Sequence, residues 1–411
     1  MARHTRRLIT WIGWGALALA VLVALAVLAL VWFADPNAWR ARIAQAASNS
    51  LGRQVQLGGD LHWDIGWNIA IASEGGIIAN APGFDATPFA QWQRMRFGLN
   101  ARALLGKRIV IDQLAIDGLK VNLQRNAAGK GNWRFAQADA ASATAAAADK
   151  PMQLRIASLQ LRNSQLAFSD ARGAAAGEVP GAASASVWQL ADLALDVDLP
   201  PDLNAPARTL RNVVLHGRLH GGGLPAQGVA VAFEAAALQH DAATSALDVP
   251  AFKASWDDAL LSGGVQAMLG AQPVAKGKLA LRVPSLRTQL TQLGIALPPM
   301  ADPKTLGKLE VECVFDLKGS SLAVTDLKAA LDATQLGGTV TVTQFTPLAL
   351  RFDLEGDSID FDRYLEPADY KGKPFELPLA QLKALNVQGA LRMKSAIVMG
   401  ARATELRLDV E

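Results

Sequence analysis

The chain has 411 residues, of which 51% are hydrophobic and 19% are charged, and its formal net charge is +3. This length exceeds one ordinary hydrophobic core and is enough for two or three domains. The small net charge gives no basis for a nucleic-acid-binding surface. The single cysteine, Cys313, cannot form an internal disulfide, and the run 308–317 around it predicts a small strand residue rather than a reactive thiol.

Residues 8–33 form a long uncharged, apolar segment that predicts one transmembrane helix. At about 1.5 Å per residue the segment spans about 39 Å, more than a bilayer core of about 30 Å. Aromatic side chains lie near both ends, with Trp11 and Trp14 on one side and Trp32 and Phe33 on the other, as at membrane interfaces. A cleaved signal peptide has an apolar region of only about 7–15 residues, so the pattern favours an uncleaved anchor.

The charges around this segment favour a cytoplasmic N-terminus, residues 1–7, because three arginines precede the helix. Arginines also follow it, at Arg40, Arg42 and Arg53, so charge alone determines the orientation only weakly.

A short amphipathic helix is predicted after the anchor. Asp35 is a suitable N-cap, Pro36 suits the first helical position, and Gly52 supplies the stop after Leu51.

From Val55 onward the hydrophobic period changes to two, which indicates β-strands. Met95, Phe97 and Leu99 alternate with polar or small residues. Asp117-Gly118 predicts a two-residue hairpin. Similar alternation occurs in the runs 154–161, 166–168, 193–199, 213–219, 229–233, 260–268, 279–283, 309–317, 336–342, 348–354, 385–393 and 406–410. Only two further helices are predicted, at 285–293 and 360–365. The expected fold is therefore mainly β, a long antiparallel meander with one apolar face.

Few helices are available to cover that face, which leaves two architectures open. Either the sheet curls into an open apolar groove that another molecule fills, or successive sheets pack as β-sandwiches. In the groove the lining side chains are predicted to include Met95, Phe97, Leu99, Ile109, Ile111, Leu119, Val121 and Leu123. Two segments rich in Ala, Gly and Ser, 136–150 and 173–186, are expected to be loops. The predicted organisation is a cytoplasmic N-terminus 1–7, a transmembrane helix 8–33, a first β domain 34–135 with its leading amphipathic helix, a low-complexity linker 136–152 and a second β region 153–411.

The sequence contains no motif that supports catalysis, so no enzyme activity, metal or cofactor is expected. His216 and His220 are four residues apart, but on the predicted strand this spacing covers about 13 Å, too far to share a metal. The carboxylates between Asp353 and Asp362 are interpreted as an exposed strand face that runs into a helix cap. The glycine-rich segment 129–133 lacks phosphate-loop spacing and predicts a turn.

In their order, these features resemble the AsmA family of bacterial envelope proteins. The resemblance rests on the basic start, the membrane helix and the short segments that follow. These are Leu51-Gly52-Arg53, Ala79-Asn80-Ala81-Pro82-Gly83-Phe84, Leu104-Leu105-Gly106-Lys107-Arg108, Ile116-Asp117-Gly118-Leu119, Gly129-Lys130-Gly131-Asn132-Trp133 and Ile359-Asp360-Phe361-Asp362-Arg363-Tyr364-Leu365. No single motif is specific, but their order is.

The resemblance implies a single-pass protein of the Gram-negative inner membrane with most of the chain in the periplasm. It further implies a chorein-like groove that binds phospholipid acyl chains and serves lipid transport, or outer-membrane homeostasis and assembly. The expected partners are membrane phospholipids and other envelope proteins. The alternative function is a periplasmic scaffold for outer-membrane protein assembly without lipid transport. Family chains usually continue further, so residue 411 is expected to lie within a longer β region.

Overall fold

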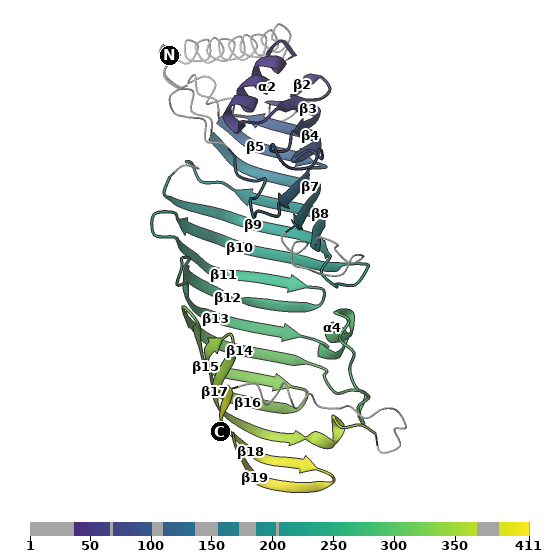
Figure 1. Cartoon of the computed structure of the whole chain (residues 1–411), viewed down its shortest axis with the longest axis vertical. Helices are drawn as coiled ribbons and strands as arrows, with labels where there is room; N and C mark the ends of the chain where they lie inside the picture. The colour runs from purple at the N-terminus through teal and green to yellow at the C-terminus, as the bar shows by residue number, and fades with distance from the viewer. Residues whose placement is uncertain are drawn as a thin grey trace, which may run out of the picture.

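The computed structural model describes residues 37–65, 69–100, 110–135, 155–171, 186–202, 205–367 and 386–410. Within these ranges nineteen strands form a single elongated sheet, with helix α2 at the N-terminal end and β19 at the other end (Figure 1). The predicted anchor 8–33 and linker 136–152 lie outside the described residues, as does nearly all of 173–186. In the described ranges, no helix is long and apolar enough to cross a membrane.

The first part of the sheet contains β1 (Val55–Leu57), β2 (Leu61–Ile65), β3 (Ile69–Ile78), β4 (Ala90–Leu99), β5 (Val110–Asp117), β6 (Lys120–Arg125), β7 (Arg155–Asp170), β8 (Ser186–Asp198) and β9 (Ala207–His220). The remainder contains β10 (Val229–Asp241), β11 (Ala246–Trp256), β12 (Ala259–Met268), β13 (Val274–Val283), β14 (Leu309–Lys318), β15 (Ser321–Leu331), β16 (Thr334–Phe345), β17 (Leu348–Asp360), β18 (Asn386–Val398) and β19 (Ala401–Val410).

The predicted short helices are present. Helix α2 (Asn37–Leu51) ends at Gly52, whose positive φ of 61° suits a helix stop. Helix α4 (Leu286–Gln292) is capped by Ser285, and the 3₁₀ turn η3 (Phe361–Arg363) is capped by Asp360. Helix α2 docks on the first strands through Asn37, which exchanges two hydrogen bonds with the backbone of Leu61, at 3.0 and 2.8 Å. The N-terminal end of the sheet is thus covered by a helix.

The sheet is mixed rather than purely antiparallel, which corrects the sequence prediction. Most neighbours are antiparallel, but β7 pairs in parallel with β5 and β6, and β18 pairs in parallel with β17. Parallel neighbours need a crossover connection, and the segments 126–154 and 361–385 supply the two crossovers. The strands also belong to one sheet, so the described chain does not form successive β-sandwiches.

The hairpin predicted at Asp117-Gly118 is wrong. Strands β5 and β6 run in the same direction, since both pair antiparallel with β4 and parallel with β7. The Gly118 N–H donates to the Arg162 carbonyl at 3.0 Å, so the ladder to β7 continues through the interruption. The φ of Gly118 is +65°. The positive φ that a glycine adopts in a hairpin turn therefore produces a kink in one long strand here.

Several other strands also bend at a residue with positive φ. Asn163 of β7 has a φ of 49° and Asp192 of β8 a φ of 50°, and the pairing between these strands shifts register beside them. On β7 both Leu161 and Ser164 are buried although they are three residues apart. Each bend therefore moves the strict alternation by one residue and keeps the apolar side chains on one face.

The interior of this sheet is shallow. In the described part of the chain, extensive contacts between strands are those between sheet neighbours. An apolar cluster is centred on Val197, Val213, Ala235 and Val249 of β8–β11. Phe233 and Phe252 stack beside it with ring centroids 6.0 Å apart. The architecture is therefore nearly one-dimensional, and each strand is stabilised mainly by its two neighbours.

Candidate functional apolar face

One row of register partners crosses the sheet from β2 to β19. In spatial order the row is Leu61, Ser73, Met95, Ile116, Leu161, Leu195, Leu215, Phe233, Ala254, Leu261, Leu281, Val311, Ala329, Leu336, Gly356, Met393 and Leu406. Residues directly opposite each other in a ladder point to the same face. Only Ser73 in this row carries a polar side chain, so we name this side of the sheet the apolar face.

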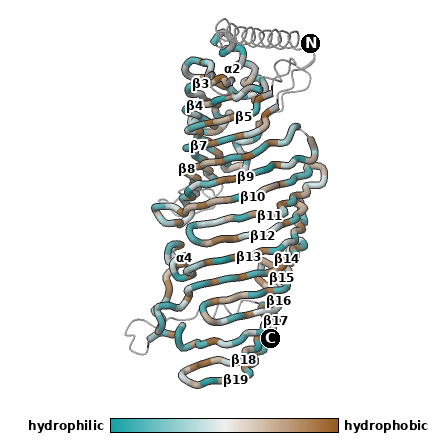
Figure 2. Tube along the Cα trace, turned by 180° about the vertical axis from the view of Figure 1, so that it is seen from behind, coloured by the Kyte–Doolittle hydropathy of each residue, from teal (hydrophilic) through white to brown (hydrophobic). Residues whose placement is uncertain are grey.

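The other side of the sheet is polar. A second row of register partners runs from β9 to β18 on that side and consists of Thr209, Gln239, Asp248, Gln266, Lys276, Asp316, Ala323, Thr341, Arg351 and Gln388. Hydropathy accordingly alternates along many of the strands (Figure 2). The chain therefore solvates one face with charged and amide groups and leaves the other face apolar along its length.

The structure brings most of the predicted groove-lining residues together on this apolar face. On β4 and β5, three pairs of register partners join these residues: Met95 with Ile116, Phe97 with Leu114, and Leu99 with Ile111. Across the kink, Val121 pairs with Leu166 and Leu123 with Phe168. Leu119 directly precedes β6, and Ile109 lies outside the described residues. Whether these side chains contact lipid stays a prediction.

The sequence prediction missed Leu114 and Ile116 in the middle of β5. The run 109–111 predicted that odd-numbered residues of this strand face the groove. The pairing of β4 with β5, however, shifts by one residue between Gly98 and Leu99. The shift brings the even-numbered Leu114 and Ile116 to the same face as Ile111. The break in alternation at Asp112-Gln113 was the available signal, because a bulge produces such a break.

Three segments that carried the family resemblance meet at the N-terminal end of the sheet, around Asn132. The Asn132 side chain is completely buried. Its Nδ2 donates to Asn80 Oδ1 at 3.0 Å and to the Asn122 carbonyl at 2.8 Å, and its Oδ1 accepts from the Gln124 N–H at 2.8 Å. The Asn132 carbonyl accepts from the Arg53 guanidinium. The segment 129–133 is thus a turn that closes back on the edge of β6.

Aromatic rings surround the two arginines beside this turn. The Arg53 guanidinium lies 4.2 Å from the ring centroid of Phe135 and 4.8 Å from that of Phe89, and its burial lowers its pKa. Trp133 packs 6.1 Å from Phe168 of β7. Because Phe168 belongs to the apolar face, the turn lies at the border of that face, near the N-terminal end of the sheet.

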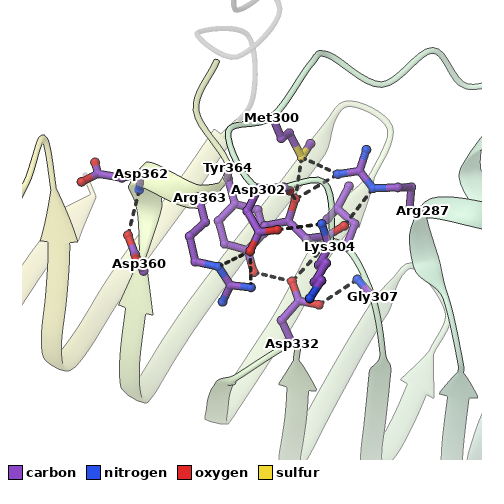
Figure 3. Close-up of polar contacts among 12 residues, drawn as sticks. Arg287, Met300, Asp302, Lys304, Gly307, Asp332, Asp360, Asp362, Arg363 and Tyr364 are labelled. Carbon is purple, nitrogen blue, oxygen red and sulfur yellow. Dashed lines mark hydrogen bonds and ion pairs between the residues drawn. The ribbon is translucent and has the colours of Figure 1, made fainter. Parts of the chain in front are cut away.

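A polar cluster holds the strand ends of β14–β17 together at one edge of the sheet, and we name it the rim brace (Figure 3). It consists of residues 300–307, Asp332 and residues 360–365. The Arg363 guanidinium donates to Asp302 at 2.8–2.9 Å, and the backbone N–H of Ala301 donates to the Leu365 carbonyl at 2.7 Å. A backbone N–H at Lys304 and the Arg363 guanidinium both hold the pKa of Asp302 below its ordinary value.

Asp332 joins the brace from the turn between β15 and β16, and Tyr364 joins it from the position directly after η3. The Asp332 carboxylate accepts from the backbone N–H groups of Leu306 and Gly307, at 3.0 and 2.7 Å, and from the Tyr364 hydroxyl at 2.7 Å. Burial, followed by this bond to Asp332, raises the pKa of Tyr364 to about 12. The brace is a contact between strands that are not neighbours, so it adds rigidity that ladder pairing alone does not provide.

The polar face carries a hollow of about 910 Å³ between β12 and β18. Several of its charged groups form ion pairs within the hollow or at its border. Arg282 lies 3.0 Å from Glu310, and Arg392 beside the hollow lies 2.9 Å from Asp353. The backbone N–H of Gln335 donates to Asp357 and lowers its pKa. The hollow offers a shaped polar surface rather than a set of uncompensated charges.

The other residues that the sequence singled out have structural positions. His216 and His220 both lie on β9, four residues apart along a strand. Among the described residues no group of three His, Cys, Asp or Glu could hold a metal ion. Asp353 and Asp357 lie on β17, and Asp360 caps η3, so the interpretation of a strand face that runs into a cap is confirmed. Cys313 is the register partner of Leu279 on the apolar face, and its burial raises its pKa.

The fold and this face define a class of protein: a single long, open β-sheet with one predominantly apolar side and a helix at its N-terminal end. A comparison with protein-family models finds a match to the AsmA family over residues 6–176, the family that the motifs predicted. The match ends beyond β7, while the same sheet continues through β19. The search of curated proteins finds no match.

Proposed function

We propose that this protein binds phospholipid acyl chains on its apolar face and aids lipid transport or outer-membrane homeostasis in the envelope of a Gram-negative bacterium. The observation that carries the proposal is the row of apolar register partners from β2 to β19. An apolar surface of this extent is costly to leave in water, at about 25 cal/mol per Å², unless it has an occupant. An acyl chain is an occupant whose chemistry requires apolar contact and no hydrogen bonds.

The proposal includes the location of the chain. Residues 8–33 anchor it in the inner membrane with residues 1–7 in the cytoplasm, and the sheet occupies the periplasm. Helix α2 and the turn at Asn132 then place the first strands near the bilayer, where a lipid would enter. The sheet curls so that its apolar face becomes an open groove, and the bends at Gly118, Asn163 and Asp192 favour such a curl. The match to the AsmA family over residues 6–176 supports this arrangement.

The test compares neighbouring residues on opposite faces of one strand. A photo-crosslinking amino acid is placed at Val311, on the apolar face, or at Glu312, the next residue and on the polar face, in the full chain within cells. Phospholipid adducts identified by mass spectrometry are expected at 311 and not at 312. Equal labelling at both positions, or none at 311 in a folded protein, would contradict the proposal.

A charge on the apolar face provides an independent check. Val121→Asp buries a carboxylate where acyl chains are proposed to lie, which disfavours occupancy. Lys120→Asp places the same charge on the opposite face, at an exposed position of β6, and serves as the matched control. The amount of co-purified phospholipid is expected to fall in the first variant and to stay unchanged in the second.

A periplasmic scaffold for outer-membrane protein assembly, without lipid transport, is the second candidate. The hollow between β12 and β18 favours it, because this polar surface has a shape that a protein segment could fill. Stoichiometric co-purification of an envelope protein, with no bound phospholipid, would support the scaffold in place of lipid transport.

A further inference from the structure

Large side chains of the apolar face lie folded over glycines of the adjacent strand. A Cβ added to Gly76 of β3 would stand 2.1 Å from the Trp92 ring of β4. One added to Gly217 of β9 would stand 2.8 Å from Leu190 of β8. The same holds for Gly356 of β17, where the added Cβ would lie 2.3 Å from the Met393 sulfur of β18. In each pair the side chain occupies the space that the glycine leaves empty.

Two of these side chains are buried. Trp92 is 6% exposed and Met393 is 3% exposed, whereas Leu408, on the outermost described strand, is 52% exposed. A glycine in a strand interior costs stability, and it often marks a close approach of another group. Here the approaching group is a bulky neighbour that bends sideways across the ladder, and the result is an apolar surface of low relief.

The pairs are spread along the sheet, at β3–β4, β8–β9 and β17–β18. Gly356 and Met393 are themselves consecutive members of the row of apolar register partners. The arrangement therefore recurs where the proposed path of the hydrocarbon runs, from the N-terminal end of the sheet to its far end.

We propose that these glycines keep the apolar face free of obstruction, so that the unbranched acyl chains of a lipid can move past its largest side chains. The inference rests on the proposed function and adds the residues that determine how fast a bound chain can move. It separates two properties of the face. Apolar chemistry holds the lipid, and the glycine pairs leave a smooth path for it.

The Gly356→Ala variant tests this separation. The atoms that an added Cβ would meet are the Met393 sulfur and methyl carbon, at 2.3 and 2.7 Å, and a Leu336 methyl group at 2.8 Å. All are the ends of flexible side chains, and the φ of Gly356 is not positive, so β17 can keep its pairing while Met393 is lifted from the surface. Gly337→Ala is the matched control, because Gly337 lies on the polar face of β16 and its Cβ would meet only the Leu327 carbonyl, at 3.3 Å.

The experiment measures two quantities on the full chain, phospholipid bound per chain and the transfer rate of a fluorescent phosphatidylethanolamine between donor and acceptor vesicles. Gly356→Ala is expected to bind the same amount of lipid and to transfer it about tenfold more slowly, which corresponds to about 1.4 kcal/mol of added barrier. Gly337→Ala is expected to leave both quantities unchanged. The double variant Gly356→Ala with Met393→Ala is expected to restore the rate, because the displaced side chain is gone.

Two results would overturn the inference while leaving the proposed function intact: an unchanged transfer rate in Gly356→Ala, or a slow rate that persists in the double variant. A folded wild-type chain that carries no phospholipid and transfers none would instead refute the proposed function, and this inference with it.

Discussion

Replacing Asn132 by alanine should open the N-terminal end of the sheet locally. The side chain makes three hydrogen bonds in a fully buried position, to Asn80, Asn122 and Gln124. Alanine removes all three of these hydrogen bonds, and of the three partners Asn80 Oδ1 still accepts from the Ala81 N–H, at 2.9 Å. At about 1 kcal/mol for each partner, the expected loss is about 3 kcal/mol of local stability.

Hydrogen–deuterium exchange followed by mass spectrometry measures this loss. A change of about 3 kcal/mol in a local opening equilibrium raises the exchange rate of the affected amides about 100-fold. The affected amides should belong to β6, to the turn 126–135 and to the segment around Asn80. Because each strand is stabilised mainly by its neighbours, the strands from β10 onward should exchange as in the wild type.

Asn126→Ala is the control within the same turn. The Asn126 side chain accepts one exposed hydrogen bond, from the Lys130 N–H at 2.9 Å, so the loss of this bond should cost about 0.5 kcal/mol and change exchange only about twofold. If Asn132→Ala changed exchange no more than this control, the buried bonds would not hold the turn. If it raised exchange equally along all strands, the argument for nearest-neighbour stability would be refuted.

Two further predictions concern single residues elsewhere in the sheet. The pKa of Tyr364 is raised to about 12 by burial and by its bond to Asp332. The stability that this group gives the rim brace is therefore fully present below about pH 10, the ordinary tyrosine pKa, and is lost as the pH rises through about 12. The difference in ultraviolet titration between wild type and Tyr364→Phe should show a midpoint near 12, and a midpoint near 10 would contradict the assignment. Gly118→Val should destabilise the kink between β5 and β6 by about 1–2 kcal/mol more than Gly118→Asn, because asparagine tolerates a positive φ and a β-branched residue does not. Equal exchange in β5 and β6 of the two variants would show that the left-handed conformation at this position is dispensable.

Much of the local structure followed from the sequence. Period-two hydrophobicity identified most of the strands, and the helical runs predicted at 285–293 and 360–365 contain α4 and η3, which Ser285 and Asp360 cap. Both are local properties, because a strand with one apolar face needs alternating residues and a helix start needs a side-chain acceptor. The order of short motifs, including the one at Asn132, also indicated the AsmA family, which the family comparison confirms over residues 6–176.

The connectivity of the sheet was decided by tertiary structure. Asp117-Gly118 carries the same signal in a hairpin turn and in a kinked strand, because both need a positive φ at the glycine. Only the pairing of both β5 and β6 with β7 shows that the strand continues. The parallel pairings likewise depend on long crossovers, whose paths no local pattern specifies.

The residues of the apolar face were likewise determined partly by the sequence and partly by the tertiary structure. The sequence determined that Met95, Phe97, Val121 and Leu123 lie on an apolar side, because neighbours two apart on a strand share a face. It did not determine that Leu114 and Ile116 join them, since a bulge reverses the parity within one strand. The pairing of Gly356 with Met393 depends on the register between two strands joined by a crossover. A strand thus sets its own two faces, but only its register with its neighbours, fixed by bends and crossovers, joins those faces into one surface.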